Sequence, residues 1–416
     1  MKILGVVVEY NPFHNGHLFH LNEAKKQTGA DYVVCVMSGN FIQRGQPALI
    51  NKWARAEMAL KNGVDLVIEL PISYTLQSAS FFAFGAVSIL HRLNAVTHIC
   101  FGSESGDIDT LKTIARILVN EPDAVSAKIR ELLVQGNSYA SAREAAVTAY
   151  LHHQCIKYDY AKILSAPNNI LGIEYIKALY QLNSPITPVT IKRHKAGYHS
   201  LKATDNIASA TAIRHLLEKE TNWHAHVKPL LPATSYAILS EEIANGRGPI
   251  FSSHFDSTIL SLLRKYSANQ LSCYPDVTEG LENRIKKAAY HCTTIEQLLT
   301  TIKTKRYTYT RLQRILFNIL IDITQNAFSR FERYQGPQYA RILGMNSAGK
   351  KLLKHITPKA SLPIIIKPAT AAKSCNPLLK EMIALDFLAT DLYTLHFNGT
   401  HTQKGRRDLL TSPIII

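Results

Sequence analysis

Short apolar runs alternate with helix-spaced apolar positions along the first half of the chain. Runs rich in Val and Ile predict buried strands at residues 3–9, 32–37, 64–70, 96–101 and 187–193. Helical spacing covers 17–28, 52–62, 78–93 and a longer stretch from about 108 to 182. Strands that are apolar throughout and joined by helices favour a parallel sheet covered on both faces, with ligands at the carboxyl ends of the strands. We therefore predict an α/β, Rossmann-like domain over residues 1–215.

The pattern changes after the fifth predicted strand. Strand signals largely disappear between about 218 and 332, and apolar residues recur at helical spacing over 257–266, 295–302 and 311–323. This predicts a helical domain over residues 216–338. Apolar runs at 339–343 and 362–366, a Lys-rich helix between them and a helix at 377–396 predict a small mixed α/β subdomain over residues 339–416.

The composition is typical of a folded protein, and the charge is distributed unevenly along the chain. Of 416 residues, 46% are hydrophobic and 19% charged, which excludes intrinsic disorder, and the net charge is +16. The first 150 residues carry 13 basic and 13 acidic side chains, whereas the last 116 carry 18 and 6. We therefore expect a polyanionic partner to bind the last third of the chain.

Cysteine spacing and hydropathy bear on the compartment. The six cysteines include no C-x-x-C pair and no zinc spacing, which fits reduced thiols. No run approaches the ~18 apolar residues of a membrane span, and Glu9 interrupts the apolar start before it reaches the length of a signal peptide. We expect a cytoplasmic protein without a membrane partner.

The sharpest local signal lies between the first strand and the first helix. There the sequence V-V-V-E-Y-N-P-F-H-N-G-H contains H-x-G-H at His14–His17. A helix N-terminus offers unpaired N–H groups and a positive dipole end, Gly16 allows a phosphate to approach the backbone, and two imidazoles can donate hydrogen bonds. This predicts a phosphate site. Zinc is a weaker alternative because no third ligand at a plausible spacing is apparent.

Two motifs carry a first resemblance. N-P-F-H-N-G-H resembles the H-I-G-H nucleotidylyltransferase superfamily, which includes class I aminoacyl-tRNA synthetases. The sequence I-A-S-A-T-A-I-R at 207–214 resembles its I-S-x-T-x-I-R motif, with Ala208 inserted, which binds the triphosphate at a second helix N-terminus. Ser209 and Thr211 also fit ordinary helix caps, and both roles are compatible.

A larger set of motifs resembles one family within that superfamily, the bacterial tRNA(Met) cytidine acetate ligases. The set adds S-G-N-F-I-Q-R-G at 38–45, F-G-S-E at 101–104, P-N-N-I-L-G-I-E-Y at 167–175, K-R-Y-T-Y-T-R-L-Q-R-I-L at 305–316 and R-I-L-G at 341–344. The resemblance spans about residues 1–350, and the last 65 residues add little to it.

That resemblance implies an activity and its residues. Members convert acetate and ATP to acetyl-adenylate, then acetylate the wobble cytidine of elongator tRNA(Met) to N4-acetylcytidine. His14 and His17 are implied as catalytic, and Arg193 with Ser209 and Thr211 as holding the outer phosphates; Mg²⁺ is expected on the triphosphate without an assigned ligand. The ATP contacts implied are Val7, Val8, Glu9, Tyr10, Asn11, Pro12, Phe13, His14, Asn15, Gly16, His17, Leu18, Phe19, His20, Gly102, Asn168, Arg193, Ser209 and Thr211.

The acetate and tRNA contacts are less determined. Residues 38–45 should face the nucleotide, where Gln43 and Arg44 bind the carboxylate or are surface residues. Basic side chains with interleaved tyrosines predict nucleic-acid binding near residues 303–350, and the candidate tRNA contacts are Lys305, Arg306, Arg311 and Arg314.

One motif resembles a phosphate-binding P-loop but lacks one of its required residues. Residues 344–350 match G-x-x-x-x-G-K, but Lys351 stands where a phosphate-binding P-loop needs Ser or Thr. We favour a Gly-rich turn that opens a helix, with Lys350 and Lys354 suited to RNA backbone contact.

Three alternatives each leave part of the sequence unused. A class I aminoacyl-tRNA synthetase lacks its usual K-M-S-K-S loop here. A small-molecule nucleotidyltransferase leaves the basic third idle, and an RNA-binding protein without catalysis leaves the histidine motif idle.

Overall fold

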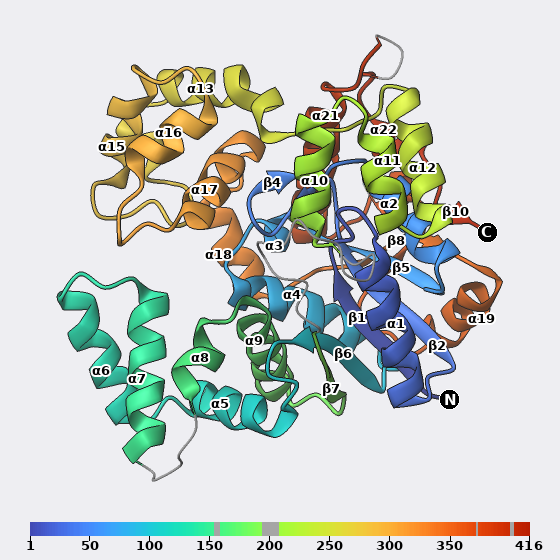
Figure 1. The fold of residues 1–416 in the computed structure, drawn as a ribbon, viewed down its shortest axis with the longest axis horizontal. Helices are drawn as coiled ribbons and strands as arrows, with labels where there is room; N and C mark the ends of the chain where they lie inside the picture. Colours follow the sequence, from blue (N-terminus) through green and yellow to red (C-terminus); the bar gives the residue numbers. More distant parts are fainter. Residues whose placement is uncertain (154–158, 194–207, 372, 400–402) are drawn as a thin grey trace.

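The computed structural model describes residues 1–153, 159–193, 208–371, 373–399 and 403–416. Its centre is a sheet in which five parallel strands lie in the order β5-β2-β1-β6-β7 (Figure 1). They are β1 (Ile3–Val8), β2 (Tyr32–Ser38), β5 (Leu66–Leu70), β6 (His98–Ser103) and β7 (Thr187–Lys192). All five coincide with predicted strands, and the predicted α/β fold with a mostly parallel sheet is confirmed.

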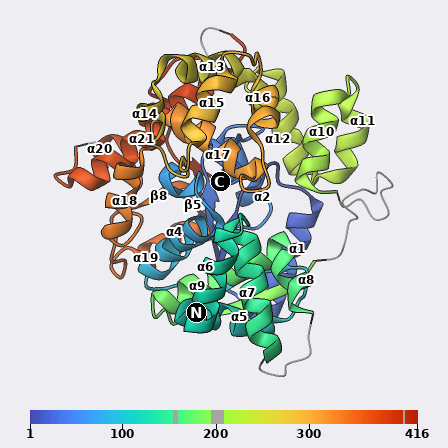
Figure 2. The ribbon, with the colours of Figure 1, turned by 90° about the vertical axis from the view of Figure 1, so that its left-hand side faces the viewer.

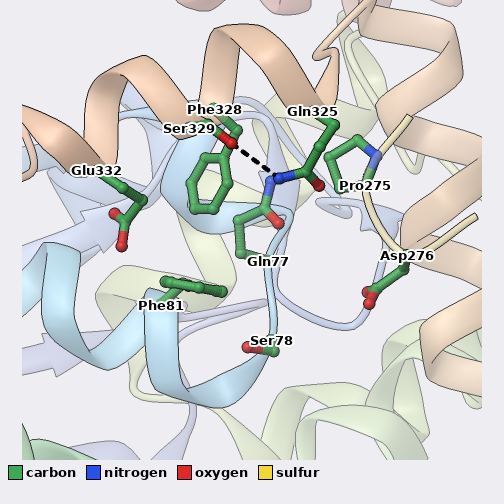
Figure 3. A pocket seen from close by; sticks show the side chains of 9 residues that line it. All are labelled: Gln77, Ser78, Phe81, Pro275, Asp276, Gln325, Phe328, Ser329 and Glu332. Atoms are coloured by element: carbon green, nitrogen blue, oxygen red, sulfur yellow. Dashed lines mark hydrogen bonds between the residues drawn. The ribbon is translucent and has the colours of Figure 1, made fainter. Parts of the chain in front are cut away.

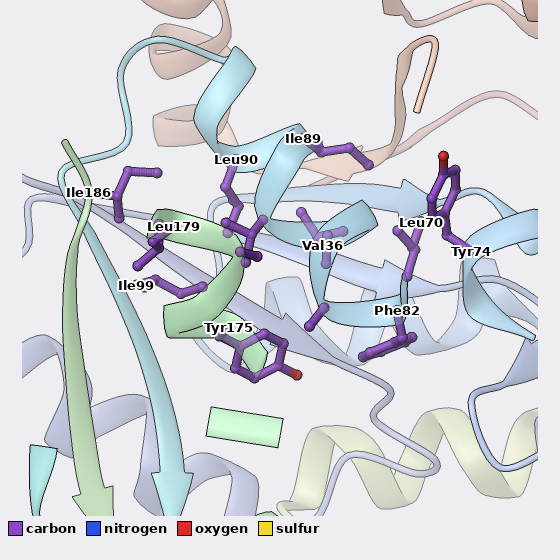
Figure 4. Packing of buried hydrophobic residues seen from close by; sticks show 14 of the residues in the cluster. Val36, Leu70, Tyr74, Phe82, Ile89, Leu90, Ile99, Tyr175, Leu179 and Ile186 are labelled. Carbon is purple, nitrogen blue, oxygen red and sulfur yellow. The ribbon is translucent and has the colours of Figure 1, made fainter. Parts of the chain in front are cut away.

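Alternate strand residues enter two different cores. Val36 of β2 packs with α4 (Ala79–Arg92) and α9 (Pro167–Gln181) on one face, as Figure 4 shows, and Val34 belongs to the same core. Val33 and Cys35 pack with α1 (Asn15–Thr28) and α2 (Lys52–Lys61) on the other face. A strand of Val and Ile without polar alternation is the pattern that burial on both faces requires. The helices are α1 (Asn15–Thr28), α2 (Lys52–Lys61), α3 (Ile72–Thr75), α4 (Ala79–Arg92), α5 (Ile108–Asn120), α6 (Asp123–Val134), α7 (Tyr139–His153), α8 (Tyr160–Ser165) and α9 (Pro167–Gln181).

The helical stretch predicted over 108–182 comprises helices α5 to α9 in the described residues 108–153 and 159–182. Pro122 precedes α6, and Gly136 adopts φ 86° between α6 and α7, so the chain turns at both positions. α9 packs against α4 and α5, which places its first residues near the end of β6. Asn168 is thereby brought to the carboxyl edge of the sheet.

A second group of helices follows β7, and no strand interrupts it within the described residues 208–333. It comprises α10 (Ala210–Lys219), α11 (Trp223–Val227), η1 (Lys228–Leu230), α12 (Ala233–Ala244), η2 (Ser252–Phe255), α13 (Asp256–Lys265), α14 (Ala268–Leu271), α15 (Leu281–Ala289), α16 (Ile295–Ile302), α17 (Tyr309–Ile321) and α18 (Gln325–Arg333). Helices α13 to α17 share a core that also contains Phe41, Ile72 and Tyr393. Figure 2 shows these helices stacked above the sheet.

The last segment returns to the central sheet. Strand β8 (Ala340–Met345) pairs antiparallel with β5, while β9 (Ile364–Ile365) and β10 (Ile414–Ile415) pair with β8. Their helices are α19 (Ser347–Ile356), α20 (Pro368–Ala371), α21 (Pro377–Thr394) and α22 (Arg407–Leu410). The sequence predicts β8 and β9 but not β10, and it assigns them to a small mixed subdomain, because strand propensity does not identify the partner strand. The boundaries at 215 and 338 stay a prediction.

Buried ion pairs join this last segment to the sheet. Lys52 Nζ lies 2.8 Å from Glu69 Oε1 and 2.7 Å from Asp408 Oδ1, and the Arg341 guanidinium contacts both carboxylates. All four side chains are at most 3% exposed. Two cations and two anions balance one another in this cluster, as buried charges require.

Candidate active site

The loop between β1 and α1 is held by hydrogen bonds from distant elements. Tyr10 adopts φ 45°, the Asn11–Pro12 peptide is cis, and His14 is the N-cap of α1. The Asn11 side-chain oxygen accepts a hydrogen bond from Leu49 N at 2.7 Å. The loop is therefore fixed at the carboxyl end of β1, the edge where ligands bind in parallel sheets.

Two histidines build the start of α1. His14 Nδ1 accepts a hydrogen bond from Gly16 N at 3.1 Å, and His17 Nδ1 accepts one from His14 N at 3.3 Å. The two rings stack with centroids 3.7 Å apart. An imidazole nitrogen that accepts a hydrogen bond carries no proton, so in both neutral rings the proton lies on Nε2. His14 and His17 thus do here what Ser and Glu do in a capping box.

Burial keeps these histidines uncharged. It lowers the pKa of His14 to about 3, with further lowering by Arg193 and Arg214. Burial and the neighbouring His14 and Arg193 hold the pKa of His17 well below its usual range. Burial and Arg193 lower the pKa of His20 to about 4. At neutral pH the positive charge at this edge therefore comes from the arginines, and the imidazoles act as neutral donors.

The second motif lies against the first. Arg214 Nη1 donates to the Asn11 carbonyl at 2.9 Å, and its Nη2 donates to Thr211 Oγ1 at 3.2 Å. Ser209 caps α10 by accepting from Ala212 N at 3.2 Å. The helix N-terminus of α10 therefore stands beside that of α1. Ile207, the first residue of the motif, lies outside the described residues.

The cysteines take no part in this site. Cys155 lies outside the described residues, and the other five cysteines are free thiols.

The ends of β6, β7 and α9 complete this edge. The Arg193 side chain lies over Gly102, where a Cβ atom would be 3.1 Å from its Cγ, and Arg193 Nη1 approaches Asn168 Oδ1 at 3.4 Å. The Glu104 carboxylate accepts from Asn168 N, Asn168 Nδ2 and Asn169 N at 2.7–3.2 Å. The predicted residues Gly102, Asn168 and Arg193 are thus brought together, and the electrostatic effect of Arg193 on three histidines places it beside the H-x-G-H turn.

Three positioning residues are absent from the predicted site. Arg214 ties the two motifs together, Glu104 caps α9, and the fully buried Arg55 donates to the carbonyls of Glu9, at the end of β1, and Ser38, at the end of β2. Arg214 and Glu104 belong to motifs already visible in the sequence. Arg55 carries no such signal, because its role depends on α2 packing across the strand ends.

The loop after β2 faces the same edge. It contains β3 (Phe41–Ile42) and β4 (Gln46–Pro47). Gln43 N donates to Glu9 Oε1 at 2.7 Å and Gln43 Nε2 donates to the Gln77 carbonyl at 3.1 Å, whereas Arg44 is exposed. Gly45, at φ 74°, abuts α17, and a Cβ atom there would lie 2.4 Å from Arg314 N. Gln43 rather than Arg44 therefore lies close to the nucleotide motif.

The four predicted tRNA contacts are in different environments. Lys305 and Arg306 are exposed, and Arg306 Nε lies 3.0 Å from Glu279 Oε2. Arg311 is half-buried, stacks on Tyr307 and donates to the Asp276 carbonyl at 2.8 Å. Arg314 is only 9% exposed. The structure therefore leaves Lys305 and Arg306 accessible and encloses Arg314 within the helical core.

The G-x-x-x-x-G-K segment does not form a phosphate loop. Asn346 Oδ1 accepts from Gly349 N at 2.8 Å, and Asn346 Nδ2 donates to Asp65 Oδ1 at 2.9 Å. A Cβ atom on Gly349 would lie 1.9 Å from the Asp65 carbonyl oxygen. Glycine is needed at position 349 because α19 packs closely against the backbone of Asp65. The favoured interpretation, a turn that opens a basic helix, is confirmed.

The described residues contain neither a cluster of metal-ligand side chains nor a helix of membrane length. Within the described ranges, no group of three or more His, Cys, Asp or Glu side chains is arranged to hold a metal ion. Among the helices in those ranges, none is long and apolar enough to cross a membrane.

Comparison with known proteins gives a consistent result. The HIGH Nucleotidyl Transferase family matches residues 1–408. A tRNA(Met) cytidine acetate ligase of Acetivibrio thermocellus is 49% identical over 418 residues and one of Halothermothrix orenii is 44% identical over 424, with at least 99% of each chain covered. The crystal structure of Thermotoga maritima TmcAL bound with alpha-thio ATP has a TM-score of 0.94 and 38% identity, covering 100% of this chain and 99% of that one. The apo form gives 0.95 and 39%, with full coverage of both chains.

Proposed function

The chain belongs to the HIGH Nucleotidyl Transferase family, and from that premise we propose that it is a tRNA(Met) cytidine acetate ligase. It activates acetate with ATP and transfers the acetyl group to the wobble cytidine of elongator tRNA(Met), forming N4-acetylcytidine. The observation that carries the proposal is the stacked pair His14 and His17, beside Arg193 and Arg214, at the carboxyl end of β1. This edge supplies neutral donors and fixed positive charge to a triphosphate.

In the first step an acetate oxygen attacks the α-phosphorus of ATP. A phosphorus–oxygen bond forms to acetate, the bond to the β-phosphate breaks, and pyrophosphate leaves, so that acetyl-adenylate remains. Acetate is an anion at neutral pH and needs no general base; it needs alignment and charge neutralisation. His14 and His17 stabilise the α-phosphate, with the proton of His14 on Nε2, and Arg193, Ser209 and Thr211 hold the outer phosphates.

In the second step the N4 amine of cytidine attacks the acetyl carbonyl carbon. The carbon–nitrogen bond forms, the mixed anhydride bond breaks, AMP leaves, and the amine releases one proton. The other proposed ATP contacts are the residues from Val7 to His20, together with Gly102 and Asn168. The small polar Gln43, held between Glu9 and Gln77, is our candidate for the acetate side of the site.

Magnesium enters this proposal only with the triphosphate. Glu104, an acidic residue of the F-G-S-E motif, already accepts hydrogen bonds from the N-terminus of α9. Because the described residues hold no set of three metal ligands, they do not form a metal site by themselves. The chain's own residues bind and orient the phosphates, and Mg²⁺ would add charge neutralisation there.

The tRNA side rests on Lys305 and Arg306, with Arg311 beside them and Arg314 as a positioning residue inside α17. A small-molecule nucleotidyltransferase would leave these exposed cations unused. We propose that the activity takes place in the cytoplasm, where a bacterial tRNA substrate is found.

Incubation with radiolabelled acetate, ATP and tRNA tests the proposal. We expect the label to enter tRNA as N4-acetylcytidine, and to do so only with ATP present. Label that remains in small molecules contradicts the function. Acetate-dependent exchange of pyrophosphate into ATP, measured without tRNA, reports the first step separately.

A further inference from the structure

A cavity of about 310 Å³ lies outside the residues assigned to ATP. Its walls come from the start of α4 and the two residues before it, from one side of α18 along its length, and from the turn at Pro275 and Asp276 (Figure 3). Its volume is at the lower end of the range of ligand pockets. The chemistry of the proposed reaction assigns nothing to it.

One wall presents a hydrogen-bond donor that lacks a partner. Gln77 is 3% exposed, and none of the residues described by the structure accepts a hydrogen bond from its Nε2. Figure 3 shows the Gln77 side chain at the centre of the lining residues, between Phe81 and Gln325. A buried amide without a partner costs about 1–3 kcal/mol, so its retention here indicates a ligand that accepts this hydrogen bond.

A second wall presents an aromatic ring. Phe81 is 38% exposed, although the next residue of the same helix, Phe82, is buried. The buried Phe328 holds it in an edge-to-face contact, with centroids 5.0 Å apart and planes at 84°. The ring is therefore fixed in orientation while part of its surface remains available for stacking.

The remaining polar groups select for an uncharged ligand. Asp276 and Glu332 place two carboxylates at opposite sides of the cavity, and Gln325 and Ser329, joined by a 3.0 Å hydrogen bond, lie between them. The Glu332 carboxylate disfavours a phosphate, whereas Asp276 is paired with Arg311, whose Nε lies 3.6 Å from Asp276 Oδ1. A flat heterocycle fits this lining: its face can stack on the aromatic ring, and the donors and acceptors on its edge can pair with the carboxamides and carboxylates.

The cavity lies between the nucleotide edge and the basic helix. Gln43 bridges Glu9, which follows β1, to the Gln77 carbonyl at the cavity. Arg311, a proposed tRNA contact, donates to the Asp276 carbonyl at the other wall. An RNA strand that reaches the β1 edge from α17 therefore passes this cavity.

We propose that this cavity binds one unpaired nucleobase of the anticodon loop, adjacent to the cytidine that is acetylated. The base stacks on Phe81, and its edge accepts a hydrogen bond from Gln77. This inference rests on the proposed function, because it assumes that the polyanion is the tRNA to be acetylated. By holding the neighbouring base, the cavity turns the acceptor nucleotide toward the β1 edge.

Steady-state acetylation with Phe81→Leu tests the proposal. We expect kcat/KM for tRNA to fall about 10-fold in Phe81→Leu, the effect of one lost base stack. Acetate-dependent ATP/pyrophosphate exchange without tRNA should keep its wild-type rate, and Phe81→Tyr should restore acetylation. Tyr139→Leu, which removes a 58% exposed aromatic ring from α7, is the matched control and should leave both rates unchanged.

Anticodon stem-loop RNAs with a single abasic position identify the base. One abasic position beside the acceptor should lower the wild-type rate about 10-fold and have no further effect in Phe81→Leu. Independent effects at every position, or loss of exchange activity in Phe81→Leu, would overturn the proposal. Failure of the wild-type chain to acetylate any tRNA contradicts the proposed function instead, so the two failures are distinguishable.

Discussion

His14 combines a structural and a chemical role in one ring. Its Nδ1 is committed to Gly16 N, so the ring is fixed at the helix N-terminus and its Nε2 proton is the one available to a phosphate. Replacement by Ala removes the N-cap acceptor together with the donor. We therefore expect His14→Ala to lower acetate-dependent ATP/pyrophosphate exchange at least about 100-fold. His355→Ala, an exposed histidine on α19, is the control; exchange at the wild-type rate in His14→Ala would remove His14 from the active site.

The depressed pKa of His14 predicts a pH effect on stability. The folded-state pKa, about 3, lies below the unfolded value of about 6.5, so below pH 6.5 protons bind the unfolded chain preferentially. His14 therefore costs no stability at pH 7 and an increasing amount as the pH falls toward 3. At pH 5 the cost is about 2 kcal/mol.

Urea unfolding at pH 7 and pH 5 measures this effect. His14→Gln has no ring to protonate, so its unfolding free energy should fall less between the two pH values than that of the wild type. Equal losses in both proteins contradict the assignment of a buried, neutral His14.

The loop that follows β2 depends on contact with a helix about 270 residues later. Gly45 has a positive φ and touches the backbone of α17, so any Cβ atom at this position displaces that helix. Gly280→Ala is a matched control, because Gly280 has φ 80° and no atom within 4 Å of its virtual Cβ. It should cost about 1 kcal/mol of unfolding free energy, and Gly45→Ala should cost more by the displacement of α17. Equal losses of unfolding free energy in the two variants, measured with urea, would mean that the loop does not pack tightly against α17.

The start of α17 and the turn before it should determine how strongly salt weakens tRNA binding. Lys305→Gln with Arg306→Gln removes two exposed cations, and we expect the slope of log affinity against log salt to decrease by roughly one unit per lost phosphate contact. ATP/pyrophosphate exchange should not change, because these residues lie outside the β1 edge. The control Lys128→Gln with Arg130→Gln removes the same charges from α6 and should leave the slope at its wild-type value. An unchanged slope in the α17 variant rejects these contacts.

Helices and strands were predicted well where their pattern is local. The runs at β1, β2, β5, β6 and β7 are apolar throughout because both faces of the sheet are covered, and this marks them in the sequence. The H-x-G-H turn and residues 209–214 were also identified locally. Pattern alone did not reveal the burial of Arg314 or the role of Arg55, since both depend on which distant element packs there.

Over the whole molecule, the four-residue ion cluster connects α2, β5, β8 and α22. Removing one buried cation leaves a carboxylate without compensation, at a cost of about 3–5 kcal/mol. We expect Lys52→Met to lower the unfolding free energy by this amount. Lys61→Met, at the other end of α2, breaks only an exposed pair with Glu57 and should cost less than about 0.5 kcal/mol. Similar urea midpoints for the two variants would show that the cluster contributes little.

The position of β8 beside β5 and of Asp408 against Lys52 has a consequence for synthesis. During translation, residues 1–215 leave the ribosome with Lys52 and Glu69 lacking the other two members of the cluster, Arg341 and Asp408, and with one edge of the sheet open. The sheet and its ion cluster are therefore completed only when residue 408 has emerged, and we expect a chain truncated before Asp408 to be less stable in its nucleotide-binding half.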